Sequence, residues 1–241
     1  MLMLTVAGAR ADGCPKATDD IATDRPDVTN SSLVVPVGSL QDENGANFSM
    51  RGDGRSIDGT NSRLRLGVAP CLEVLVDLPT YFANIQGGGN SGFSDVAPAI
   101  KWQISPLPGA FELSVATGVA LPTGAVAIAG HGAQPYLQLP WSSELRDGWG
   151  ISGMFTNLPT NSPLKRPSCS NASSPSAPFS LSNMSAITTS MANLAISSIR
   201  AAAIASHPPS RSISHVGSGL NENAPAYIFG IGYSFRLDGL F

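Results

Sequence analysis

The chain has 241 residues, of which 13% are charged, and a formal net charge of -3. That length allows one large domain or two small ones. The charge pattern shows neither the basic patch typical of nucleic-acid binding nor an acidic tail, so no nucleic-acid partner is expected. The longest uncharged apolar stretches fall short of the roughly 18 residues that a membrane helix needs, which argues against a helical span.

The first residues resemble the end of a secretory signal. An apolar start leads to Ala9-Arg10-Ala11, which has the A-x-A form of a cleavage site, ahead of Asp12. We therefore expect residues 1–11 to be the remnant of such a signal and the rest to be exported. An ordinary apolar N-terminus is the alternative, and a lipid attached at Cys14 is a weaker one because the preceding residues lack the usual apolar side chain.

Export would place the cysteines in an oxidising compartment. Cys14 and Cys71 could then form a disulfide that ties the N-terminal segment to an early strand. Two unpaired thiols remain the alternative, because sequence alone cannot bring the two Cα atoms within bonding range.

Period-two alternation of apolar and polar residues, the pattern of a β-strand, recurs along the chain. It is clearest in residues 63–68, 72–78, 100–104, 111–121 and 149–155. The run 111–121 matches the ~9–11 residues of a tilted transmembrane strand. Residues rich in glycine, proline and asparagine at 58–61, 87–90 and 106–109 predict the connections. Short strands separated by turns predict an all-β fold with antiparallel pairing.

The C-terminal strand separates a membrane barrel from a soluble one. Its bulky face is Tyr227, Phe229, Ile231, Tyr233, Phe235 and Leu237, and the last residue, Phe241, keeps the same parity. The opposite face is Ile228, Gly230, Gly232, Ser234 and Arg236. A bulky apolar face opposite small residues and one arginine is typical of a strand between lipid and a lumen. A buried strand of a soluble β-sandwich or lipocalin-like domain is the alternative.

The polar members of the alternating strands are the candidate lumen-lining residues. They are Arg63, Arg65, Glu73, Asp77, Lys101, Gln103, Glu112 and Arg236. Opposed charges in a lumen can form a constriction that sorts solutes by size and charge. They could instead pair with each other inside a filled barrel. Asp24 and Arg25 precede the first clear strand and could lie in the lumen as a plug. The aromatic residues Tyr81, Trp102, Trp149, Tyr227 and Tyr233 could form interfacial girdles or pack ordinarily.

Several short motifs together resemble the outer-membrane transporters of the meta-pathway phenol-degradation family. They are TDRPD at 23–27, VPVGS at 35–39 with ENG at 43–45, RLR at 63–65 with DLP at 77–79, DVAP at 95–98, LPTG at 121–124 and GIGYSFR at 230–236. The resemblance covers roughly residues 21–160 and 215–241. It implies an antiparallel transmembrane β-barrel of about 10–12 strands in the outer membrane of a Gram-negative bacterium, with passive uptake of small hydrophobic or aromatic solutes.

Between about residues 163 and 214 the alternation stops and serine, alanine and proline dominate. A disordered linker would have this composition. A compensated frameshift would also produce it, because serine and alanine codons read two bases later restore aliphatic residues and glycine. We favour the frameshift, and expect the barrel to be incomplete or irregular there. The chain then divides into a signal remnant (1–11), an N-terminal segment with the first strands (12–62), barrel strands (63–160), an aberrant segment (161–214) and C-terminal barrel strands (215–241).

No catalytic or metal-binding signature stands out. His131, His207 and His215 have no ligand spacing, no G-x-S-x-G elbow occurs, and the glycine clusters lack a phosphate-binding pattern. We expect no enzyme activity, no cofactor and no metal. The expected partners are outer-membrane lipid, the barrel-assembly machinery and a small hydrophobic or aromatic solute. A structural membrane barrel without transport, or a soluble binding domain, is the alternative.

Overall fold

The computed structural model describes residues 13–17, 19–25, 29–86, 89–104, 111–129, 132–144, 150–157, 210–218 and 225–241. The expected signal remnant, Trp149 and residues 161–209 of the aberrant segment lie outside the described residues.

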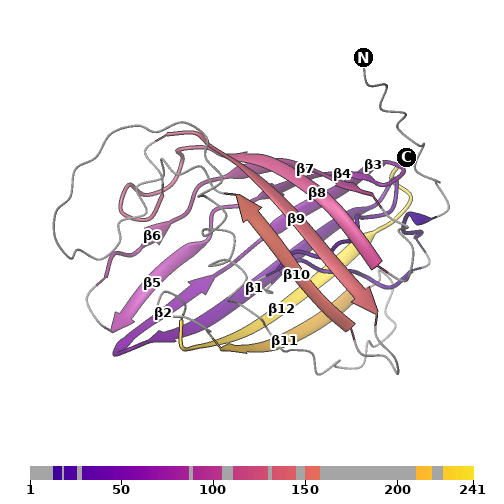
Figure 1. The fold of residues 1–241 in the computed structure, drawn as a ribbon. Helices are drawn as coiled ribbons and strands as arrows, with labels where there is room; N and C mark the ends of the chain where they lie inside the picture. Colours follow the sequence, from indigo (N-terminus) through magenta and orange to yellow (C-terminus); the bar gives the residue numbers. More distant parts are fainter. Residues whose placement is uncertain are drawn as a thin grey trace, which may run out of the picture.

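One antiparallel sheet contains all twelve strands of the described residues (Figure 1). The strands are β1 (Leu40–Arg51), β2 (Gly54–Gly59), β3 (Arg63–Ala69), β4 (Leu72–Asp77), β5 (Tyr81–Gln86), β6 (Gly92–Phe93), β7 (Ala97–Gln103), β8 (Phe111–Ala120), β9 (Gln134–Glu144), β10 (Gly150–Asn157), β11 (Ser210–Ser218) and β12 (Tyr227–Leu237). No helix in this part of the chain has the length and apolar character needed to cross a membrane.

Several of these strands are halves of longer ones. Strands β2 and β3 both pair with β1, β2 with its second half and β3 with its first. Strands β4 and β5 pair with β3 and β2 in the same way, and β7 and β6 continue the pattern. The connection expected at residues 58–61 lies between β2 and β3, and the chain continues there in the same direction.

The interruptions lie side by side across the sheet. Residues 60–62, 78–80 and 94–96 separate the paired halves. Pro79 has no N–H to donate to the sheet. Around it, side chains and isolated backbone hydrogen bonds replace the regular pairing between strands. Leu78 donates its N–H to the Ser62 carbonyl, and the Thr80 N–H bonds to the Ser94 hydroxyl. Three broken but collinear strands therefore let the sheet bend without losing its pairing.

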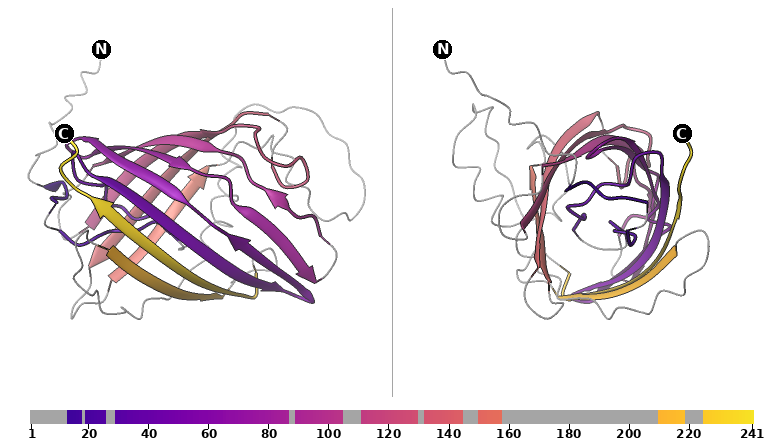
Figure 2. Two further views of the ribbon diagram at one scale, coloured as in Figure 1. Left: turned by 180° about the vertical axis from the view of Figure 1, so that it is seen from behind. Right: turned by 90° about the vertical axis from the view of Figure 1, so that its right-hand side faces the viewer.

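The sheet curls into a barrel, as the all-β antiparallel prediction expected. Strand β12 pairs with β1 over eleven residue pairs, which joins the C-terminal strands to the first strand. Viewed along its axis, the sheet forms a ring with part of the N-terminal segment inside it (Figure 2). Within the described residues the two ends of the sheet, β10 and β11, are not paired with each other.

The distribution of side chains is the reverse of that in a soluble protein. The fully buried large side chains are mainly charged or polar, including Arg65, Glu73 and Lys101. The exposed large side chains are apolar and include Ile100, Ile231 and Tyr233. On β12 the alternation follows the sequence expectation, with Phe229 and Ile231 pointing outward and Gly230, Ser234 and Arg236 inward.

The N-terminal segment enters the barrel across Gly67. A Cβ atom at Gly67 would lie 2.0 Å from the Pro36 carbonyl oxygen. The two backbones touch there because Gly67 donates its N–H to the Ser39 carbonyl and accepts from the Gly38 N–H. Only a residue without a side chain permits this approach.

We expect Gly67→Ala to destabilise the folded barrel by about 1–3 kcal/mol, because the added methyl group would displace the backbone of residues 35–36. Urea unfolding of the refolded protein measures the change. Gly59→Ala is the control, since a Cβ at Gly59 would meet only Ala46 at an ordinary 3.7 Å. Equal stability of the two variants would contradict the close approach at Gly67.

Candidate functional site: a plugged lumen

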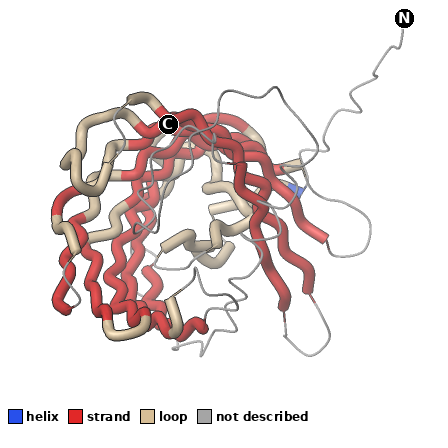
Figure 3. Tube along the Cα trace, turned by 60° about the vertical axis from the view of Figure 1, so that its left-hand side comes forward, coloured by secondary structure: helices blue, strands red, loops and turns tan. Residues whose placement is uncertain are grey.

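The N-terminal segment before β1 lies in the interior of the barrel (Figure 2), and Figure 3 shows loop segments inside the ring of strands. We call residues 13–36 the plug. Its described residues form no regular strand, so their backbone groups must find partners other than a sheet ladder. Side chains that point inward from the strands provide those partners, and together they form the candidate functional site.

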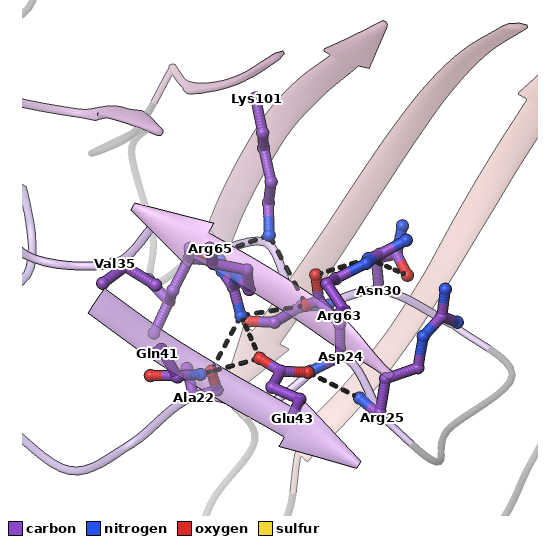
Figure 4. Close-up of polar contacts among 12 residues, drawn as sticks. Ala22, Asp24, Arg25, Asn30, Val35, Gln41, Glu43, Arg63, Arg65 and Lys101 are labelled. Carbon is purple, nitrogen blue, oxygen red and sulfur yellow. Dashed lines mark hydrogen bonds and ion pairs between the residues drawn. The ribbon is translucent and has the colours of Figure 1, made fainter. Parts of the chain in front are cut away.

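Arg65 on β3 is the centre of this site (Figure 4). Its guanidinium lies 2.8 Å from Glu43 on β1, 3.0 Å from Glu73 on β4 and 3.4 Å from Asp24 of the plug. All four side chains are fully buried. Lys101 on β7 adds a second cation, 3.5 Å from Asp24 and 3.6 Å from Glu73. The plug thus inserts one carboxylate among charges from four strands.

A second group of ion pairs adjoins the first. Arg63 binds Asp77 with two parallel hydrogen bonds of 2.7 and 2.8 Å, and reaches Asp24 with a third at 2.8 Å. Arg25 of the plug binds the same carboxylate, donating at 2.7 Å to the Asp77 Oδ1 atom that also accepts from Arg63 Nε. The two-pronged contact between guanidinium and carboxylate fixes orientation as well as charge.

The two groups balance in charge. Four carboxylates and four cations take part, and we call these eight residues the lumen network: Asp24, Arg25, Glu43, Arg63, Arg65, Glu73, Asp77 and Lys101. Buried charges are tolerated only when they are paired and hydrogen-bonded. The strands supply three cations and three carboxylates that pair with each other, and the plug adds one of each: Asp24 contacts Arg63, Arg65 and Lys101, and Arg25 contacts Asp77.

The lumen network also satisfies the plug backbone. Glu43 accepts the N–H groups of Asp24 and Arg25, at 2.7 and 2.9 Å. Glu73 accepts the Val35 N–H at 2.7 Å, and Arg65 donates to the Leu33 carbonyl at 2.8 Å. Each of these strand side chains therefore holds an ion pair and a piece of plug backbone together.

Further inward side chains hold the rest of the plug. Gln103 accepts the Val34 N–H and donates to the Gly13 carbonyl. Arg236 donates to the carbonyls of Ala17 and Asp19. Glu112 accepts a hydrogen bond from Ser32 at 3.0 Å. A cavity of about 470 Å³ lies beside these contacts, lined by residues from the plug, Gln41, Glu112 and Arg236.

A disulfide fixes the start of the plug. Cys14 is bonded to Cys71 at the turn between β3 and β4, with the two Cα atoms 5.1 Å apart. Cys71 adopts a left-handed backbone conformation, with a φ of 59°, at this tight turn. The bond closes a loop over 57 positions of sequence and keeps the plug next to the strands that carry Arg65 and Glu73.

The charge of Asp24 is stabilised by its surroundings. Burial by itself raises the pKa of the Asp24 carboxyl, but the attraction of three neighbouring cations, Arg65 first among them, outweighs burial and holds that pKa well below its usual range. The carboxyl therefore stays ionised in the folded barrel. Its contribution to stability is complete above the unfolded-state pKa of about 4 and is lost only as the pH falls below that value.

All of the candidate lumen residues named from the sequence lie on the inner side of the sheet, and Asp24 and Arg25 lie in the plug. The charges pair with each other and with the plug, the second of the two arrangements considered from the sequence. Sequence reasoning missed Glu43 and Gln41, because residues 40–51 carry few aliphatic side chains and show only weak alternation. The spacing of Gln41 and Glu43, two polar residues one strand period apart, was the available signal.

The described residues contain no group of three or more His, Cys, Asp or Glu side chains placed to hold a metal ion. The chemistry of the lumen network is electrostatic: it binds a segment of the same chain and places paired charges inside the barrel. Such a network can obstruct a passage and control its opening.

We expect Arg65→Met to destabilise the barrel by about 3–5 kcal/mol, because three buried carboxylates would lose their shared cation. Urea unfolding followed by tryptophan fluorescence provides the measurement. Arg55→Met on the exposed side of β2 is the matched control, with an expected change below about 0.5 kcal/mol. A similar small loss in both variants would mean that Arg65 does not organise the interior.

Comparison with known proteins places the chain in a family. Two solved structures are similar: an outer membrane channel from Pseudomonas putida F1, with 10% sequence identity and a TM-score of 0.48, covering 89% of this chain and 100% of that one, and the outer membrane protein OprG from Pseudomonas aeruginosa, with 8% identity and a TM-score of 0.30, covering 87% and 100%. No curated protein matches. A family model described as "Putative MetA-pathway of phenol degradation" matches residues 23–157, more than half of the chain, and the chain belongs to this family.

Proposed function

We propose that the protein is an outer-membrane channel for small hydrophobic or aromatic solutes, and that the plug holds this channel in a closed state. The observation that carries the proposal is the reversed barrel: paired charges lie on the inside while large apolar side chains cover the outside. An outer surface of this kind needs lipid rather than water as its solvent.

The outward face supports insertion in a membrane. Ile231 in the middle of β12 is 67% exposed, and Ile100 on β7 is 50% exposed. The aromatic residues expected to form girdles also point outward: Tyr81, Trp102, Tyr227 and Tyr233 are between 43% and 53% exposed. Amphipathic rings on a lipid-facing surface favour the boundary between hydrocarbon and headgroups.

The solute class is suggested by the family and is compatible with the interior. The family description concerns phenol degradation, and a small aromatic ring needs only a narrow passage. The plug blocks a wide aqueous pore, so a solute can pass only where the plug or the barrel wall gives way. We therefore expect low ion conductance in the ground state.

The filled interior also favours a second candidate, a structural barrel that transports nothing. Eight paired charges that hold a disulfide-anchored plug would serve equally well to stabilise a closed barrel. The two candidates differ in whether any solute crosses. A transport measurement on the whole chain separates them.

The test uses the full-length protein refolded into vesicles whose outer leaflet is lipopolysaccharide, because ordinary phospholipid bilayers let small aromatics through unaided. Uptake of labelled phenol and toluene is compared with that of empty vesicles. Faster uptake of either solute supports the channel. Equal uptake with and without protein, in vesicles where the protein is shown to be inserted, supports the structural barrel and overturns the channel.

The plug generates a prediction about conductance. We expect Asp24→Asn to increase single-channel conductance or open time in planar bilayers severalfold, because Arg63, Arg65 and Lys101 would then repel each other around a neutral side chain. Asp42→Asn is the control, since Asp42 lies on the outward side of β1. If both variants conduct like the parent protein, Asp24 does not hold the passage closed.

Insertion in lipid generates a second prediction. Ile231→Arg is expected to lower the free energy of unfolding in vesicles by about 2–4 kcal/mol, as for an arginine near the bilayer midplane. Tyr227→Arg, on the same face at the end of β12, should cost only about 0–1 kcal/mol. Loss of this difference would show that the outer face of β12 does not cross the hydrocarbon region.

A further inference from the structure

The cavity of about 470 Å³ beside the plug extends to the disulfide that anchors the plug. Cys14 and its neighbours Gly13, Pro15 and Lys16 are among the residues that line this cavity. Cys14 is partly exposed, whereas Cys71 is only 3% exposed. Of the two bonded cysteines, Cys14 is therefore the one that a molecule in the cavity can approach.

Strand direction shows which end of the barrel holds this cavity. Cys71 lies in the short turn between β3 and β4, residues 70–71, while residues 121–133 join β8 to β9 at the opposite end. Outer-membrane barrels have short periplasmic turns and longer extracellular loops. This pattern indicates that the cavity faces the periplasm, an oxidising compartment in which the disulfide is the resting state.

The start of the plug is also held by hydrogen bonds. The Gln103 side chain donates to the Gly13 carbonyl at 3.2 Å, and Arg236 donates to the carbonyls of Ala17 and Asp19 at 2.7 and 3.0 Å. Such bonds contribute about 0.5–3 kcal/mol each. The ion pairs of the lumen network lie further along the plug. Loss of the disulfide would therefore loosen the start of the plug while the lumen network stays in place.

We propose that the disulfide between Cys14 and Cys71 is a thiol-exchange site, which a small thiol reaches through the cavity, and that exchange releases the start of the plug. The site does not depend on which solute crosses the barrel, because it acts on the plug.

The exchange takes two steps. A thiolate attacks the Cys14 sulfur, the disulfide bond breaks, and Cys71 leaves as a thiolate that takes a proton from water. A second thiolate attacks the incoming sulfur of the mixed disulfide and frees Cys14, so two small thiols are oxidised to one disulfide while the two cysteines are reduced. Gln103 keeps the cysteines near each other, because its backbone N–H also donates to the Cys71 carbonyl at 2.9 Å. The bond can therefore form again.

The charges around the cavity favour a thiol that carries no negative group. Its lining contains three carboxylates and two cations: Asp19, Asp20, Glu112, Lys16 and Arg236. Arg236 is already paired with Asp238 at 2.8 Å. The remaining excess of negative charge attracts a cationic thiol and repels an anionic one.

The test measures reduction of the disulfide in the folded full-length barrel in detergent micelles. A Cys169→Ser background leaves Cys14 and Cys71 as the only cysteines. Cysteamine and 2-mercaptoethanesulfonate are two-carbon thiols of opposite charge, and each rate is corrected for the fraction of ionised thiol. Alkylation and mass spectrometry count the reduced cysteines, while tryptophan fluorescence shows that the barrel stays folded.

We expect the rate to rise in proportion to thiol concentration, and cysteamine to react severalfold faster. Reduction only in urea, or at a rate independent of thiol concentration, would mean that the disulfide opens only on unfolding and would overturn the site. Reduction by a thioredoxin-type protein but by neither small thiol would also overturn it.

A charge reversal tests whether the thiol arrives through the cavity. Asp20→Lys should lower the preference for cysteamine severalfold, because the variant gains positive charge in the cavity wall. Asp53→Lys, in the exposed turn between β1 and β2 at the other end of the barrel, is the matched control and should keep the preference of the parent. The same preference in both variants would exclude this cavity as the route.

Trypsin measures release of the plug. We expect cleavage after Lys16 to become severalfold faster once the disulfide is reduced and alkylated, because the chain must leave the barrel to enter the protease. Cleavage after Arg51, next to the turn between β1 and β2, is the internal reference. A double variant, Cys14→Ser with Cys71→Ser, should be cleaved like the reduced protein. Equal cleavage after Lys16 with and without the disulfide would show that exchange does not release the plug.

Discussion

The structure depends on the pairing of charges that have been removed from water. An unpaired guanidinium or carboxylate inside the barrel would cost several kcal/mol, so the inward residues of β1, β3, β4 and β7 can fold together only as a balanced set. Asp24 and Arg25 are the members that the strands do not supply. Asp24 is the carboxylate that Arg63, Arg65 and Lys101 share, and without it each of these neighbouring cations would lose one ion pair. The plug therefore contributes to the stability of the barrel wall and also obstructs the lumen.

The plug depends in turn on the side chains of the strands. The plug has no ladder of its own, and Glu43 and Glu73 accept its N–H groups while Arg65 donates to one of its carbonyls. The disulfide from Cys14 to Cys71 lowers the number of conformations that the plug must lose when it docks. A passage could open by partial displacement of the plug while the disulfide holds its start in place.

The sequence predicted the barrel where alternation was strong. The runs 111–121 and 227–237 coincide with β8 and β12, and the inward positions of Arg63, Arg65 and Arg236 followed from parity alone. The position of a residue in an alternating strand determines on which face of the sheet its side chain lies, but it does not determine which residue that side chain contacts. The contacts of Glu43 with the plug depend on the fold of an irregular segment that has no period. The direction of the chain at the connection of residues 58–61 was not predictable for a related reason: Asp58-Gly59-Thr60-Asn61 suits a reversal or a bend equally well, and pairing with the distant β1 decided between them.

Strand direction places a constraint on the part of the sequence between β10 and β11. When the collinear halves are counted together, the described sheet crosses the barrel nine times, and β10 and β11 run in the same direction. Antiparallel closure therefore requires an odd number of further crossings, and one or three would give the even total usual for such barrels. A lipid-facing crossing needs an apolar residue at every second position, and residues 163–209 as written, rich in serine, alanine and proline, do not have that pattern. The frameshift hypothesis would account for this composition, because serine and alanine codons read two bases later give aliphatic residues and glycine, the residue types that such crossings require. A genuine linker would leave the edges of β10 and β11 to be satisfied by something other than strands of this chain, at a cost of several kcal/mol for each unpaired group in hydrocarbon.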